Sequence, residues 1–146
     1  MSQGQEAPQF STIDLSGTPV SSDDFAGRLS ALLFITPNCP ACADSLENDI
    51  EYLKHKAEGN LIVICESGRE DCTQIAETFE LDVPVVADED KSISRLFTIS
   101  SVPMVVIINT DNRIQSYGRP ERAKPEELMA GVSKTVVPEA GRDDYR

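Results

Sequence analysis

The sequence predicts one α/β domain in which helices cover both faces of a mixed β-sheet. The first observation behind this prediction is the order of the hydrophobic patterns, which run β-α-β-α and then β-β-α. The second is composition, because 40% hydrophobic and 26% charged residues are typical of a soluble globular protein. The third is that no apolar run approaches the roughly 18 residues that span a bilayer.

Length and charge narrow the classes of function. A chain of 146 residues buries about two thirds of its unfolded surface, so it needs no disulfide to hold a core, and its cysteines are expected to be free for chemistry. The net charge of −12 disfavours nucleic acid and membrane surfaces as partners. Residues 1–8 lack the features of a secretory signal, which favours a cytoplasmic location; a periplasmic location is the alternative if a signal or anchor has been removed.

The N-terminal segment is expected to form a small hairpin. Residues 10–15 alternate apolar and polar side chains, and a glycine separates them from Val20. Ser22 or Asp23 then provides a cap for a short helical turn that ends after Phe25.

The central part of the chain supplies the parallel half of the sheet. Residues 31–35 and Leu61–Cys65 are consecutive apolar runs and are predicted to be buried strands. One continuous helix is expected between them, beginning near Cys39 or Pro40, because apolar side chains recur every three or four residues, at Leu46, Ile50, Leu53 and Ala57. A second helix is expected to have its apolar face at Cys72, Ile75, Ala76 and Phe79.

The last part of the chain predicts an antiparallel half. Residues 83–87 suit a short edge strand because Pro84 lacks a backbone N–H, and residues 102–108 and 114–117 suit two strands of a hairpin. The acidic run at residues 88–90 is expected to be a solvated turn before a short helix, whose apolar residues are Ile93, Leu96 and Phe97.

A final helix is predicted to begin at Pro125, with its apolar residues at Leu128, Met129, Val132 and Val136. The domain is accordingly expected to occupy residues 1–137, and residues 138–146 are expected to form a flexible C-terminal tail.

The motif Cys39-Pro40-Ala41-Cys42 is the main indication of chemistry, because it joins a buried strand to a helix. At a helix N-terminus, unsatisfied N–H groups and the helix dipole favour the Cys39 thiolate, which makes this residue a nucleophile. Cys42 lies one helical turn later, where its sulfur is able to close a disulfide with Cys39 and to resolve a mixed disulfide. The placement favours a redox pair over a structural disulfide or half of a zinc site.

The other cysteines and the single histidine have simpler interpretations. Cys65 and Cys72 are expected to be small buried apolar side chains, and a second redox or relay pair is the alternative that their position at the carboxyl edge of the sheet leaves open. His55 lies on the polar side of its helix and is expected to be a solvated surface residue.

Residues 8–10, 14–17 and 24–27 are similar to the N-terminal hairpin of one branch of the thioredoxin superfamily, the TlpA-like and AhpC/TSA redoxins. Residues 32–42 match the active-site strand and Cys-x-x-Cys of that branch, so the resemblance covers nearly the whole chain. Residues 34–42 look most like MauD-like proteins, which handle disulfides during the maturation of methylamine dehydrogenase. The resemblance implies a thioredoxin-like fold with an N-terminal hairpin extension.

The resemblance also implies a platform for substrate. Val102-Pro103 occupies the position of the family's cis-proline facing the Cys-x-x-Cys loop, where an extended substrate segment would pair with the backbone of Val102. Pro40, Val102 and Pro103 are therefore the predicted substrate-binding residues. The sequence departs from the family pattern at two positions: Asn38 replaces the usual tryptophan, and Leu33 replaces the usual buried acid. The second replacement leaves the proton acceptor for Cys42 unidentified.

Three functions are compatible with these residues. The first is a thiol-disulfide oxidoreductase without a cofactor, acting on a disulfide-bearing protein or small-thiol substrate and served by a thiol electron donor or acceptor. The second is a peroxiredoxin, which is favoured by Thr36 three residues before Cys39. Against it, Leu32 stands where that family has a proline, and the candidate for its pocket arginine is Arg119. The third is a module that holds Cu(I) or Zn(II) between Cys39 and Cys42.

Overall fold

The computed structural model describes residues 2–120 of the chain. The helix predicted from Pro125, the tail at 138–146 and the domain boundary at residue 137 lie outside these residues. None of the helices within the described part is long and apolar enough to cross a membrane.

A five-stranded mixed sheet forms the centre of the fold, in the order β5-β4-β3-β6-β7. Its strands are β3 (Ser30–Ile35), β4 (Leu61–Cys65), β5 (Val85–Ala87), β6 (Met104–Ile108) and β7 (Ile114–Gly118). The central strand β3 pairs parallel with β4 and antiparallel with β6. This confirms the predicted parallel and antiparallel halves, and β5 lies at the edge of the sheet as expected.

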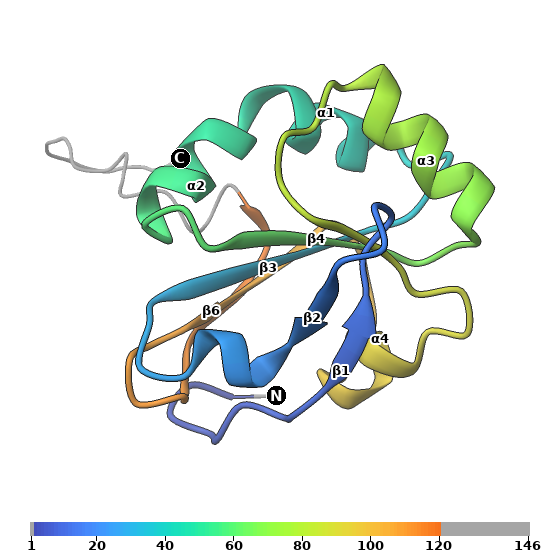
Figure 1. The fold of residues 1–146 in the computed structure, drawn as a ribbon. Helices are drawn as coiled ribbons and strands as arrows, with labels where there is room; N and C mark the ends of the chain where they lie inside the picture. The colour runs from blue at the N-terminus through green and yellow to red at the C-terminus, as the bar shows by residue number, and fades with distance from the viewer. Residues whose placement is uncertain (1, 121–146) are drawn as a thin grey trace, which may run out of the picture.

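Helices cover both faces of the sheet (Figure 1). One face carries α1 (Pro40–Asn48), α2 (Ile50–Lys56) and α3 (Arg69–Thr78). The other carries α4 (Ser92–Leu96), the hairpin of β1 (Ser11–Ile13) and β2 (Pro19–Ser21), and the short 3-10 helix η1 (Ser22–Phe25). The fold class and the N-terminal hairpin predicted from the sequence are therefore confirmed.

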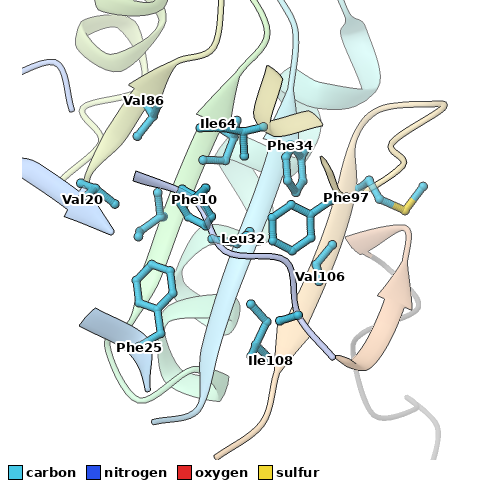
Figure 2. Close-up of a cluster of buried hydrophobic side chains, with 14 of the residues drawn as sticks. Phe10, Val20, Phe25, Leu32, Phe34, Ile64, Val86, Phe97, Val106 and Ile108 are labelled. Atoms are coloured by element: carbon cyan, nitrogen blue, oxygen red, sulfur yellow. The ribbon is translucent and has the colours of Figure 1, made fainter. Parts of the chain in front are cut away.

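Each face of β3 builds its own hydrophobic core, because successive side chains of a strand point to opposite faces. Leu33 and Ile35 pack with the side chains of α1, α2 and α3. Leu32 and Phe34 pack on the other side with aromatic side chains of the hairpin segment and α4 (Figure 2). All residues of β3 are buried, which places the strand that leads to Cys39 in the interior of the fold.

The helix expected to continue from Cys39 to Ala57 is broken at Asp49. Asp49 has a φ of −112°, away from the ideal helical value, although its N–H still donates to the carbonyl of Ser45 at 2.8 Å. The apolar positions predicted for this segment are nevertheless all buried on one face, namely Leu46, Ile50, Leu53 and Ala57. Periodicity identified the buried face correctly but missed the break.

Three local expectations were wrong. The cap of the short helical turn is Ser21, whose hydroxyl accepts the N–H of Asp23 while the Asp24 carboxylate accepts the N–H of Ser21. Leu96 points outward and is 46% exposed. Asp88 is buried, and its carboxylate accepts the backbone N–H groups of the residues that begin α4, so it is a structural anchor and not a solvated turn residue.

Candidate active site

The loop between β3 and α1 delivers Cys39 to the N-terminus of the helix. Asn38 adopts a left-handed backbone conformation with φ of 58°, which asparagine tolerates better than most residues, and Cys39 follows in an extended conformation as the N-cap. Pro40 is the first helical residue, where its missing N–H costs no hydrogen bond. The predicted position of Cys39 at the start of the helix is confirmed.

Cys39 and Cys42 form a disulfide, with their Cα atoms 5.2 Å apart. The Sγ atom of Cys39 also accepts the backbone N–H of Cys42 at 3.0 Å. The two sulfurs differ in access, because Cys39 is half-buried whereas Cys42 is only 2% exposed. Cys39 is therefore the more accessible of the two cysteines.

Val102 and Pro103 lie beside the loop that carries Cys39. The antiparallel register between β3 and β6 ends at the pair of Phe34 and Met104, and Pro103 and Val102 directly precede Met104. Val102 is half-buried and packs against the same hydrophobic cluster as Cys42. The Val102–Pro103 peptide bond is cis, as the family resemblance implied.

A cavity of about 620 Å³ opens beside Cys39, between α1 and α3. Cys39, Pro40 and Leu46 line one wall, and Ile75 of α3 and Phe79, the residue after this helix, line the opposite wall. Its surface beside the disulfide is thus largely apolar, with room for a side chain of a partner molecule. Sequence reasoning did not anticipate that the second helix approaches the motif so closely.

Among the described residues that line this cavity, Asp71 on α3 is the one carboxylate, and it is an exposed residue. Its Oδ2 atom accepts a hydrogen bond from the Ser67 hydroxyl at 2.8 Å. The two acids nearest to the motif in sequence, Asp44 and Glu47, are exposed and do not line it. Asp71 was not singled out from the sequence because it is distant from the motif along the chain.

Residues 3–117 match the AhpC/TSA family. The chain belongs to the AhpC/TSA family. The thiol-disulfide oxidoreductase ResA of Bacillus thuringiensis subsp. konkukian is 25% identical over 142 residues, covering 94% of this chain and 80% of the relative. Peroxiredoxin Bcp of Escherichia coli is 30% identical over 100 residues, covering 66% of this chain and 64% of the relative.

The solved structures place this AhpC/TSA chain in the thioredoxin-like fold. A secreted disulfide oxidoreductase of Mycobacterium tuberculosis, homologous to Escherichia coli DsbE, superposes with a TM-score of 0.66 at 20% identity, covering 75% of this chain and 81% of that one. The thioredoxin superfamily and its redoxin branch, inferred from residues 32–42, are thereby confirmed.

The remaining candidate residues of this AhpC/TSA protein differ in whether they lie near Cys39. Thr36 lines the cavity together with Cys39, whereas Arg119 does not. His55 is exposed, as expected. No group of three or more His, Cys, Asp or Glu side chains within residues 2–120 is arranged to hold a metal ion, so the zinc alternative gains no support there.

Cys65 and Cys72 are fully buried, as predicted, but they are not free thiols. They form a second disulfide that joins the end of β4 to the first turns of α3, so no cysteine of the chain is free. The expectation of two separate apolar side chains was wrong because the seven-residue separation did not reveal that the turn after β4 brings α3 back over the strand end.

Proposed function

We propose that Cys39 and Cys42 carry the activity of this thiol-disulfide oxidoreductase. In the reducing direction, the Cys39 thiolate attacks a substrate disulfide and releases one substrate thiol, leaving a mixed disulfide on Cys39. The Cys42 thiolate then attacks the sulfur of Cys39, releases the second substrate thiol and closes the Cys39–Cys42 disulfide. Two electrons pass to the substrate, and the reverse sequence oxidises a dithiol.

The difference in access between the two sulfurs carries this assignment. Half-exposed Cys39 stands at a helix N-terminus and accepts the N–H of Cys42, whereas Cys42 itself is buried against it. Both the dipole and the hydrogen bond favour the thiolate of Cys39, so nucleophilicity and access coincide on one residue. Cys42 is left with the intramolecular step.

The proposed substrate is a protein disulfide. We expect the backbone of Val102, which precedes the strand paired with β3, to hold an extended segment of the substrate. The cavity between α1 and α3 would then receive a side chain of that substrate. A small thiol would use neither surface fully. The resemblance of residues 34–42 to MauD-like proteins supports a protein undergoing maturation as the substrate class.

Trapping of the mixed disulfide tests the assignment. A Cys42→Ser variant should accumulate a covalent complex with a disulfide-bearing protein such as insulin, visible by mass spectrometry and released by reductant. A Cys39→Ser variant, as the matched control, should form none and should not reduce insulin. Equal trapping by both variants, or none by either, would contradict the proposed roles.

The reduction potential of the Cys39–Cys42 pair reports the direction of electron flow. A value near −270 mV would support a reductase in the cytoplasm, whereas a value of about −120 to −180 mV would support an oxidase or isomerase in a periplasmic compartment. Equilibration of the purified protein with glutathione buffers gives this value.

A thiol peroxidase is the second candidate, favoured by Thr36 beside Cys39 in the cavity and by the similarity to peroxiredoxin Bcp. Against it, Leu32 stands where that motif has proline, and Arg119 lies away from the cavity. The Cys42→Ser variant separates the two activities, because peroxide needs only Cys39 to form a sulfenic acid. Rapid formation of sulfenic acid by micromolar peroxide would favour the peroxidase.

A further inference from the structure

The second disulfide has no part in the exchange proposed for Cys39 and Cys42. Cys65 is the last residue of β4 and pairs in register with Ile35 of β3 and Ala87 of β5. Cys72 lies near the start of α3, and both cysteines are 0% exposed. The bond thus connects the most rigid part of the sheet to one surface helix.

This bond is the deepest attachment of α3 to the rest of the protein. Cys72 is the one fully buried residue of the helix, and the N-cap residue Gly68 provides no side-chain cap. The other contacts at this end are peripheral: the Arg69 guanidinium donates to the carbonyl of Leu15 in the hairpin segment, and the Ser67 hydroxyl donates to Asp71. Without the disulfide, the apolar contacts left to hold this part of α3 would be those of the partly buried Ile75 and Ala76.

The position of α3 in turn shapes the cavity beside the active cysteines. Asp71, Ile75 and Phe79 of this helix face Cys39 and Pro40 across the cavity. Because Asp71 directly precedes Cys72, a shift of the start of α3 moves the cavity wall with it. The redox state of one cysteine pair is therefore mechanically connected to the surface that surrounds the other.

We propose that the Cys65–Cys72 disulfide is a second, regulatory redox centre that sets the affinity for protein substrates; this inference rests on the proposed function of Cys39 and Cys42. In the oxidised form the bond holds α3 as the outer wall of the cavity. A dithiol reductant delivers two electrons and two protons, converts the bond into two thiols and becomes a disulfide itself. The freed start of α3 then no longer presents a fixed surface to the substrate.

The reduced form has partners for the new thiol. The Sγ atom of Cys72 lies 3.5 Å from the carbonyl oxygens of both Cys65 and Ser67, so its S–H group finds an acceptor without leaving the interior. When the start of α3 packs on the sheet again, the two thiols meet, and a disulfide oxidant takes up the two electrons and two protons as the bond re-forms. These features suit a bond that is reversibly broken.

The two disulfides should respond to reductant at different rates. Cys39 is half-buried and open to attack, whereas both sulfurs of the second pair become accessible only when α3 opens locally. The native protein, treated with dithiothreitol for increasing times, alkylated and analysed by mass spectrometry, should lose Cys39–Cys42 first. Loss of Cys65–Cys72 first or at the same rate, or free thiols at these positions in the air-oxidised protein, would overturn the proposal.

Kinetics with two substrates test the effect on recognition. In a Cys65→Ala/Cys72→Ala variant, KM for insulin should rise about fivefold with little change in kcat, the pattern of lost substrate binding. The rate with the small disulfide 5,5′-dithiobis(2-nitrobenzoic acid) should stay within about twofold, since that substrate needs no fixed α3 wall. A matched Val20→Ala variant loses core packing on the opposite face of the sheet and should leave both values unchanged.

The outcomes distinguish this proposal from the function on which it rests. An unchanged KM for insulin in the double variant, with an active wild type, would overturn the regulatory role alone. An equal rise of KM in Val20→Ala would show a general effect of destabilisation and would also overturn it. A wild type that reduces neither substrate would overturn the proposed function itself. If the double variant does not fold, the timed reduction of the native protein still decides the order in which the bonds open.

Discussion

The backbone N–H of Cys42 points at the Sγ atom of Cys39 from 3.0 Å. A donor at this distance stabilises negative charge on the sulfur more than it stabilises a neutral thiol. The same helix places Cys42 behind Cys39, where the residue is 2% exposed. One turn of helix therefore separates a sulfur that reacts with the outside from one that does not.

The first prediction concerns this difference. In the protein with Cys39–Cys42 reduced, iodoacetamide at pH 7 should alkylate Cys39 roughly tenfold faster than an unperturbed cysteine, because the thiolate fraction is raised. Cys42 should react far more slowly than Cys39. Mass spectrometry of timed, quenched samples measures both rates, and equal rates at the two positions would contradict the assignment of nucleophile and resolving cysteine.

The second prediction concerns the aromatic core on the face opposite α1. Phe97 is fully buried, with its ring centroid 6.0 Å from that of Phe10 and 5.8 Å from that of Phe34. Phe97→Ala should lower the free energy of unfolding by about 3–5 kcal/mol. The neighbouring Leu96→Ala is the control and should change it little, because Leu96 is 46% exposed. Urea unfolding measures both, and similar losses would show that this packing has been misjudged.

The buried strands were predictable because a short run of apolar residues, such as Leu61–Cys65, is typical of a strand in a sheet that is covered on both faces. It also placed Cys39 correctly, because a helix N-terminus leaves a local signal in the motif and in Pro40. The break at Asp49 left no such signal. Apolar spacing reports which face is buried, and both a straight and a bent helix bury the same face.

Contacts between distant segments were the other limit. Asp88 is an acidic residue after a strand, and in the sequence this pattern predicts a solvated turn. In the fold, α4 covers Asp88, and backbone N–H groups of α4 donate to its carboxylate. The pairing of Cys65 with Cys72, and the place of Asp71 in the cavity, depend equally on the path of the chain after β4. Such relationships arise from the tertiary fold and have no counterpart in local spacing.

The third prediction concerns acid stability. Burial alone would raise the pKa of Asp14, but hydrogen bonds from the Ser16 hydroxyl and from the backbone N–H groups of Ser16 and Thr18 outweigh it, so the pKa lies below its usual value. The folded state therefore holds its proton less tightly than the unfolded chain. The resulting stabilisation is complete above the unfolded pKa of about 3.9 and is lost as the pH falls through the lower, folded value.

An Asp14→Asn variant tests this sign. At pH 7 it should be less stable than the wild type by about 1–2 kcal/mol, because the amide is a weaker acceptor for three hydrogen bonds. The difference should shrink as the pH falls below about 4, where the wild-type carboxylate becomes protonated as well. Thermal unfolding across this pH range measures it; a difference that grows in acid would reverse the sign assigned to Asp14.

The last prediction addresses the proton of Cys42. Resolution of the mixed disulfide requires Cys42 to lose its proton, and Asp71 is the one carboxylate that lines the cavity shared with Cys42. Asp71→Asn keeps the shape of the side chain and an oxygen for the Ser67 hydroxyl, but it removes the carboxylate that we expect to take the proton. The rate of resolution should fall roughly tenfold or more, while the initial attack by Cys39 should be nearly unchanged.

Single-turnover experiments separate these two steps, because formation and decay of the mixed disulfide are followed independently. Asp44→Asn is the matched control: Asp44 is an exposed acid on α1, it is held by the Asn48 side chain, and it does not line the cavity. Its loss should leave both steps intact. If the two variants slow resolution equally, the effect comes from the change in net charge, and water rather than Asp71 takes the proton from Cys42.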